Sequence, residues 1–173
     1  MTRLVALLRG INVGGNKRVP MGDLAEVGVG LGWQEPRTHL NSGNLWFTSA
    51  DAPVDAARRL SDALHARFGF VVDVVVVEVD RVRRVAAGCP FEGDPKQVNV
   101  AFCSGEVDAD QAARLAALAV EGERVAVAGD VVYVDFGGGL ARSKLAAGMA
   151  QALRPLVVTT RNIRTVGRLA SGS

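Results

Sequence analysis

Cysteine, aromatic side chains and long hydrophobic runs are all scarce in this sequence, and each scarcity argues against a class of protein. Two cysteines among 173 residues are too few for a disulfide framework, so we expect a reducing, cytoplasmic location. Aromatic residues make up 5% of the chain, which favours a small anionic ligand over nucleic acid held by base stacking. The longest apolar stretches, 4–8 and 71–79, are too short or too interrupted by charge to span a membrane, so we expect no membrane partner.

Groups that hold metals or activate nucleophiles are also few. His39 and His65 are the only histidines, and no Cys-x-x-Cys or His-x-x-x-His spacing is present, so we predict no metal site and no cofactor. Ser42, with His39 three residues before it, and Asp135 leave a hydrolase or transferase open as an alternative. Ser42 does not lie in the Gly-x-Ser-x-Gly pattern of a nucleophile elbow. The sequence alone leaves catalysis undecided.

The charge of the chain is unevenly distributed, although its composition is that of an ordinary globular protein. The net charge is +2, but residues 136–173 contain no acidic residue and carry +6, which leaves −4 on residues 1–135. A basic C-terminal part favours an anionic ligand. One alternative is a protein or nucleic-acid interaction module that uses this basic face. The other is a basic segment that pairs with the acidic part of its own chain.

Two successive series of apolar segments predict the same order of elements, strand-helix-strand-strand-helix-strand. The first series comprises strands at 4–8, 37–40, 45–48 and 71–78, with helices that start at Pro20 and near Pro53. The second comprises strands at 98–103, 124–128, 131–136 and 156–159, with helices from Asp108, where Gln111 completes a capping box, and over 141–154. This order is typical of the split β-α-β fold.

We therefore predict an α+β protein of two ferredoxin-like subdomains that arose by internal duplication. Each subdomain has an antiparallel sheet with helices packed on one face, and right-handed crossovers give the strand order 4-1-3-2. The predicted subdomains are 1–79 and 97–173, joined by a helix and loop over 80–96. The segment 71–79 is apolar on both faces at a sheet edge, so we expect the second subdomain, or a second copy in a homodimer, to cover it.

This topology predicts where the polar residues of the first subdomain gather. The first two strands run parallel, so the Arg9–Arg18 loop and the Asn41–Asn44 turn emerge at the same rim of the sheet. We predict a site for an anionic, phosphate-bearing ligand at this rim. Its predicted ligand-binding residues are Arg9, Asn12, Lys17, Asn41, Ser42 and Asn44, completed from the second subdomain by Lys144, Arg161 and Asn162.

Two segments of this predicted site have alternative interpretations. Gly10 and Gly15 have the spacing of a phosphate-binding P-loop, but Asn16 occupies the lysine position. The loop is then either an anion-binding nest of backbone N–H groups or a flexible connection. At the C-terminal segment, a threonine is expected to cap a short helix that exposes Arg161 and Arg164 on one face, where they would bind phosphate or form an internal salt bridge.

Several strings resemble an uncharacterised, mostly bacterial family, domain of unknown function 1697. The strongest are Leu-Leu-Arg-Gly-Ile-Asn-Val-Gly-Gly at 7–15 and Val-Pro-Met at 19–21, and weaker ones are at 41–44, 143–145, 160–162 and 165–166. The resemblance implies two similar α+β halves and brings no established activity, substrate or cofactor. The chain departs from the family at Asn41, usually glutamine, at Arg168, usually lysine, and at Ile163, usually aromatic, which removes a ring for base stacking.

Overall fold

The computed structural model describes residues 1–39 and 43–172, so the predicted site residues Asn41 and Ser42 lie outside the described residues. The chain divides into two compact units. Unit 1 comprises Met1–Arg83 with Arg168–Ser173, and unit 2 comprises Arg84–Gly167. Two helices, α3 (Val79–Ala87) and α6 (Ile163–Leu169), cross the boundaries between the units in the sequence. The described residues contain no helix that is both long and apolar enough to cross a membrane.

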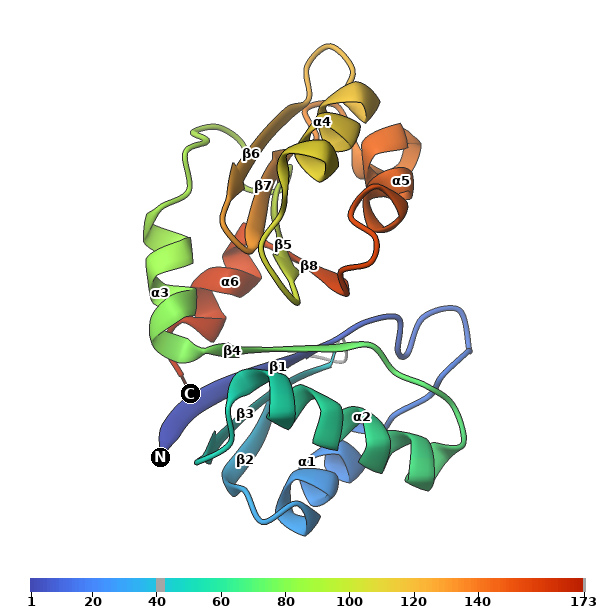
Figure 1. Cartoon of the computed structure of the whole chain (residues 1–173), viewed down its shortest axis with the longest axis vertical. Coiled ribbons are helices and arrows are strands. Elements are labelled where there is room, and N and C mark those ends of the chain that lie inside the picture. The colour runs from blue at the N-terminus through green and yellow to red at the C-terminus, as the bar shows by residue number, and fades with distance from the viewer. Residues whose placement is uncertain (40–42, 173) are drawn as a thin grey trace. The chain divides into compact units, whose positions relative to one another are not determined.

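Unit 1 has the predicted topology (Figure 1). Its elements are β1 (Thr2–Leu8), α1 (Met21–Gly30), β2 (Gln34–His39), β3 (Asn44–Ser49), α2 (Pro53–Phe68) and β4 (Val74–Glu78). The strands form one antiparallel sheet in the order β2-β3-β1-β4, which is the predicted 4-1-3-2 order, and both helices lie on one face of it.

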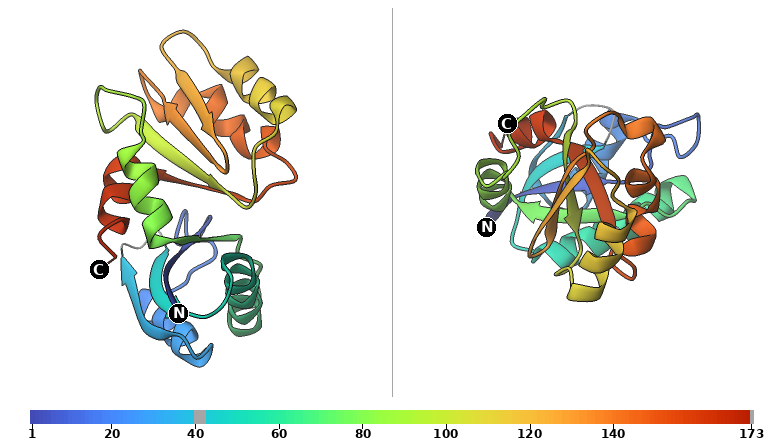
Figure 2. Two further views of the ribbon diagram at one scale, coloured as in Figure 1. Left: turned by 60° about the vertical axis from the view of Figure 1, so that its left-hand side comes forward. Right: turned by 90° about the horizontal axis from the view of Figure 1, so that it is seen from above.

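Unit 2 repeats this topology, and Figure 2 shows its sheet from two further directions. Its elements are β5 (Val98–Cys103), α4 (Ala109–Leu118), β6 (Arg124–Ala128), β7 (Val131–Asp135), the 3₁₀ helix η1 (Leu140–Arg142), α5 (Lys144–Ala152) and β8 (Val158–Asn162). The antiparallel strand order is β6-β7-β5-β8. The predicted fold class, an α+β protein with two ferredoxin-like units, is confirmed.

The period-two pattern of β1 explains the core of unit 1. Leu4, Ala6 and Leu8 share one apolar cluster with Leu24 of α1 and Leu60 of α2, and all five are buried. Burying a leucine side chain contributes about 1.5–3 kcal/mol, so this cluster holds the helices on the sheet.

Unit 2 has a core of the same kind under α4 and α5. Ala101 of β5 and Val132 and Val134 of β7 pack with Leu115 of α4 and Leu145 of α5. The capping box predicted at the start of α4 is confirmed, since the Asp108 carboxylate accepts from the Gln111 backbone and the Gln111 side chain accepts from the Asp108 backbone.

Both closing strands differ from their predicted positions. β4 starts at Val74 instead of residue 71, and its Val74 and Val76 belong to the core of unit 1. The cover expected for the other face of β4 stays a prediction. β8 covers Val158–Asn162 instead of 156–159, because Thr159 and Arg161 pair with β5 before α6 begins at Ile163.

The last residues of the chain group with unit 1, although the sequence places them with the second subdomain. Leu169 is fully buried, and its carbonyl accepts from Trp46 Nε1 at 3.2 Å. The Arg83 side chain donates to the carbonyl of Ala170 at 2.8 Å, and Arg3 donates to the carbonyl of Gly172 at 3.1 Å. These bonds tie the C-terminal segment to unit 1, so unit 2 is an insertion between two parts of unit 1 in the sequence.

Candidate functional site

The loop after β1 and the turn between β2 and β3 meet at one rim of the unit 1 sheet. Leu7 pairs with Asn44 across the strands, and the Leu8 N–H donates to the carbonyl of Gly43 at 2.9 Å. Asn44 is fully buried, and its amide donates to the carbonyl of His39 at 2.8 Å. The shared rim is therefore confirmed where the turn is described, and the Asn44 side chain holds the end of β2 in place.

Residues 12–17 of the loop form a small hairpin rather than a P-loop. The Asn12 N–H donates to the carbonyl of Lys17 at 3.1 Å, and the Asn16 N–H donates to the carbonyl of Val13 at 3.2 Å. Between them Gly14 and Gly15 have φ angles of 62° and 78°, as a type I′ turn requires. Gly14 and Gly15 thus form a tight turn. Gly15 therefore has a structural role, although its spacing from Gly10 resembles that of a phosphate-binding P-loop.

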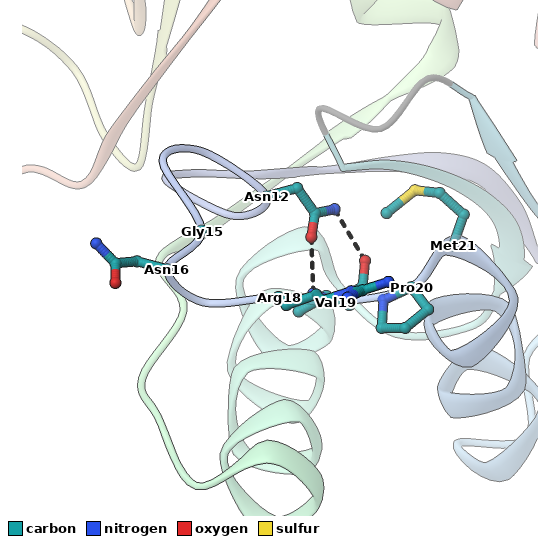
Figure 3. Close-up of a pocket in the computed structure, with 7 residues that line it drawn as sticks. All are labelled: Asn12, Gly15, Asn16, Arg18, Val19, Pro20 and Met21. Carbon is teal, nitrogen blue, oxygen red and sulfur yellow. Dashed lines mark hydrogen bonds between the residues drawn. The ribbon is translucent and has the colours of Figure 1, made fainter.

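Two of the predicted ligand-binding residues support this hairpin through their side chains. The Asn12 amide accepts from the Val19 N–H at 2.8 Å and donates to the Val19 carbonyl at 2.9 Å, which closes the base of the loop (Figure 3). The Lys17 ammonium donates to the carbonyl of Val71 at 2.9 Å. Both residues have positive φ angles, 56° and 47°, so each shapes the backbone as well as bracing it.

Arg9 lies at the start of the loop, half exposed. Its N–H donates to the carbonyl of Asp73 at 2.9 Å, and its guanidinium is 4.0 Å from the Asp73 carboxylate. An exposed ion pair at that distance contributes at most about 1 kcal/mol, so the Arg9 charge remains available to a ligand.

A cavity of about 330 Å³ lies beside the hairpin. It is lined by Asn12, Gly15, Asn16, Arg18, Val19, Pro20 and Met21, so Arg9 and Lys17 are near it in sequence but do not line it (Figure 3). Arg18 is exposed and has no hydrogen-bond or ion-pair partner among the described residues. The Asn16 side chain points away from Asn12, toward the outside of the loop.

The first turn of α1 also borders this cavity, through Pro20 and Met21. No side chain caps the helix, because proline occupies the N-cap position. The first N–H groups of a helix lack partners within the helix and carry partial positive charge, so they attract anions. Asp23 adds a negative charge in this turn, but Arg67 lies 3.4 Å from its carboxylate and offsets it. The cavity therefore combines one cation with an uncapped helix N-terminus.

In unit 2, Arg161 is not on an exposed helix face, and that expectation is wrong. It lies in β8 with its side chain buried, and it donates to Thr159 Oγ1 at 2.7 Å and to the Thr160 carbonyl at 3.0 Å. Burial lowers the pKa of Arg161 to about 10. Lys144 is exposed at the first position of α5, whose N-cap is Ser143.

Asn162 has a structural role at the end of β8. Its amide donates to the carbonyls of Pro95 at 3.0 Å and Val98 at 3.2 Å, and its side-chain oxygen accepts from the Arg164 N–H at 2.9 Å. It thereby joins the segment before β5 to the start of α6. Because Lys144, Arg161 and Asn162 all belong to unit 2, their participation in a ligand site on unit 1 stays a prediction.

Among the residues considered for catalysis, Asp135 has structural partners, whereas the buried His39 Nε2 has no hydrogen-bond partner among the described residues and Ser42 lies outside them. Asp135 hydrogen bonds with Arg124, which holds the pKa of its carboxyl below the usual range, and it also accepts from the Gly137 N–H at 2.9 Å. Burial raises the pKa of the Cys103 thiol to about 12, which makes it a poor nucleophile. Within residues 1–39 and 43–172, no three His, Cys, Asp or Glu side chains are grouped as metal ligands.

Arg18 and the start of α1 are functional candidates that are missing from the site predicted from the sequence. Both lay just outside the predicted ligand-binding set, and both border the cavity. The signal was present in the sequence, because Pro20 starts the helix without Ser, Thr, Asp or Asn before it.

The fold defines a class, a two-unit α+β protein with two four-stranded antiparallel sheets. The chain belongs to the family described as "Protein of unknown function (DUF1697)", whose model matches residues 1–133. The family strings at 143–145, 160–162 and 165–166 lie beyond that match.

A solved structure supports the fold over the whole chain. The conserved bacterial protein SP0830 from Streptococcus pneumoniae is similar with a TM-score of 0.79 and 23% sequence identity, over 99% of this chain and 97% of that chain. A comparison with curated proteins found no match. Family and structural neighbour thus establish the fold and leave the function unknown.

Proposed function

We propose that unit 1 binds a small phosphate-bearing anion in the cavity beside residues 12–21. The observation that carries the proposal is the meeting of Arg18, without a polar partner among the described residues, and the uncapped start of α1 on one cavity. A guanidinium donates two parallel hydrogen bonds to phosphate oxygens, and helix N–H groups donate to a third. The cavity volume of about 330 Å³ is at the lower end for small-molecule sites, so a phosphomonoester suits it better than a dinucleotide.

The other predicted residues take supporting roles in this proposal. Arg9 contributes positive charge near the loop, whereas Asn12 and Lys17 hold the hairpin that shapes the cavity. Asn44 holds the end of β2 through its bond to the His39 carbonyl. Asn41 and Ser42 remain proposed ligand contacts from the sequence and lie outside the described residues.

A thermal-shift screen tests the proposal. Nucleotides, sugar phosphates, inorganic phosphate and sulfate are added to the wild-type protein, to Arg18→Ala and to Arg58→Ala. Arg58 is an exposed arginine on α2 and serves as the matched control. A phosphate compound at a hundred times its Kd stabilises the wild type by about 2.7 kcal/mol. We expect Arg18→Ala to weaken binding at least tenfold and Arg58→Ala to leave it unchanged. Equal effects of the two substitutions, or no shift with any anion, would refute the proposal.

A basic interaction surface is the second candidate. Four basic residues of unit 2 after position 135 are exposed and form no ion pair among the described residues, namely Arg142, Lys144, Arg154 and Arg164. This function predicts salt-sensitive binding to an acidic protein or nucleic acid that is independent of Arg18. The buried Arg161 does not contribute to such a surface.

The shared topology and the cysteines support two broader proposals. The identical strand order of the two units supports their origin by internal duplication. Cys89 and Cys103 are both free thiols, which supports the cytoplasmic location inferred from the sequence.

A further inference from the structure

A second cavity lies within unit 2, between helices α4 and α5. Its volume is about 530 Å³, and it is lined by Arg114, Ala117, Leu118, Gly148, Gln151, Ala152 and Arg154. This volume is within the range of small-molecule sites. No acidic residue is among these lining residues, so the two arginines are not neutralised within the cavity.

Helices α4 and α5 approach each other closely at Gly148, and the floor of the cavity beside this contact is formed by small apolar residues. A Cβ atom on Gly148 would lie 2.9 Å from Leu118 Cδ1, which is closer than real side chains pack. Ala117 and Ala152, both small, line the cavity together with Leu118. The surface formed by these residues offers methyl and methylene groups, and Gln151, next to Ala152 in the chain, is the one uncharged polar side chain of the lining.

Both positive charges lie at one end of this floor. Arg114 Nε donates to the carbonyl of Ala152 at 2.9 Å, which places its guanidinium at the C-terminal end of α5. Arg154 follows two residues later, whereas Gly148 lies one helical turn earlier. The terminal nitrogens of Arg114 and the whole Arg154 guanidinium have no partner among the described side chains and carbonyls. The cavity is thus polar and cationic at one end and apolar along the rest.

We propose that this cavity binds an apolar carboxylate, with its carboxylate between Arg114 and Arg154 and its alkyl chain along Ala117, Leu118 and Gly148. One cationic end and one apolar trough match a ligand with a single anionic head and a single tail. An acidic peptide would place charges along its length, and the trough beyond the arginines offers them no partner. This site is independent of the proposed phosphate site, which lies in unit 1.

Calorimetric titration with decanoate tests the proposal on the full chain. We expect saturable binding of one equivalent, affinity that rises about fourfold for each methylene from hexanoate to decanoate, and at least tenfold weaker binding of decanol, which lacks the charge. Binding independent of chain length, or equal binding of decanol, would overturn the proposal. Binding of an acidic helical peptide without binding of decanoate would also overturn it and would favour a protein partner.

Three variants locate the ligand. The double variant Arg114→Gln/Arg154→Gln removes both charges, and Ala117→Glu places a carboxylate over the apolar trough. Each is expected to weaken decanoate binding at least tenfold. Arg142→Gln, an exposed arginine of the same unit outside the cavity, is expected to leave it unchanged. If the double variant does not fold, Ala117→Glu and the chain-length series still decide. Equal effects of Arg142→Gln and the double variant would show non-specific charge attraction and contradict the site.

Discussion

The two units have the same strand order but differ in how they connect the first strand to the first helix. In unit 1 the connection from β1 to α1 is residues 9–20, and in unit 2 the connection from β5 to α4 is residues 104–108. Both are anchored alike at the rim, since the Leu8 N–H donates to the Gly43 carbonyl and the Cys103 N–H donates to the Asp130 carbonyl, each at 2.9 Å. The fold therefore requires only the short connection.

The extra residues of the long connection contribute little to packing. Ile11 and Val19 at its base are buried, but every residue from 12 to 18 is exposed. Asp108 caps the start of α4, whereas the start of α1 has no side-chain cap. Exposed loops carried on a rigid sheet are frequent binding sites. Since residues 12–18 add little to packing, the difference between the connections supports the proposal that this segment borders a ligand site.

The largest effect is expected where the unit 1 turn packs against the long connection. A Cβ on Gly43 would lie 2.6 Å from Ile11 Cδ1 and 2.9 Å from Leu8 Cβ, at a φ of 81°. Gly43→Ala should lower the free energy of unfolding by about 2–4 kcal/mol, from overpacking and backbone strain together. Gly10→Ala, also at positive φ but in open space, should lower it by only about 1 kcal/mol. Urea unfolding measures both, and equal losses would show that turn and loop are not packed together.

A smaller loss of stability is expected when the side-chain hydrogen bonds that hold the two connections are removed. Asn12→Ala removes two hydrogen bonds to Val19 and should lower stability by about 2 kcal/mol. In unit 2 a single side-chain bond, from the Val157 N–H to Ser104 Oγ, holds the connection, so Ser104→Ala should lower stability by about 1 kcal/mol. Asn12→Ala should also weaken phosphate binding, whereas Ser104→Ala should not. A larger loss of stability from Ser104→Ala than from Asn12→Ala would contradict this difference between the two connections.

A smaller contribution to the free energy of unfolding, made by Asp135 in unit 2, should be lost in acid. Its pKa is lowered chiefly by the hydrogen bond from Arg124, so the ionised carboxylate stabilises the fold above its unfolded pKa near 3.8. That stability is lost as the pH falls through the lower, folded pKa. Asp135→Asn should therefore be less stable than the wild type at pH 7, with the gap closing below about pH 4. Denaturant titrations from pH 7 to pH 2 measure the gap. A gap that does not change with pH would exclude this ion pair as its source.

The smallest change in stability is expected at Arg9. Its exposed pair with Asp73 is long, so Arg9→Ala should alter the free energy of unfolding by less than about 0.5 kcal/mol. It should nevertheless weaken phosphate binding severalfold, because it removes a positive charge from the loop that borders the cavity. A stability loss without any loss of affinity would make Arg9 structural.

Topology was predictable from the sequence, and side-chain partners were not. The two series of apolar segments and right-handed crossovers suffice for the strand order of both units. They do not reveal that the Asn12 amide is bonded to Val19, since an amide in a polar loop serves a ligand or the backbone equally well. Arg161 was misplaced because Thr159 and Thr160 are typical both of a helix N-cap and of a strand, and pairing with β5 decides for the strand.

The packing of the C-terminal segment on unit 1 could not be predicted for a related reason. The bonds to Leu169, Ala170 and Gly172 come from Trp46, Arg83 and Arg3, which lie at least 87 residues away along the chain. No local pattern encodes such pairs, because they depend on tertiary structure alone.

Backbone amide NMR of the protein titrated with inorganic phosphate shows which N–H groups lie beside the bound anion. The proposed phosphate site predicts saturable shifts of the N–H signals of Gly15, Arg18, Met21 and Gly22, and the loss of these shifts in Arg18→Ala. Shifts confined to residues 84–167, or shifts of the loop that persist unchanged in Arg18→Ala, would contradict it.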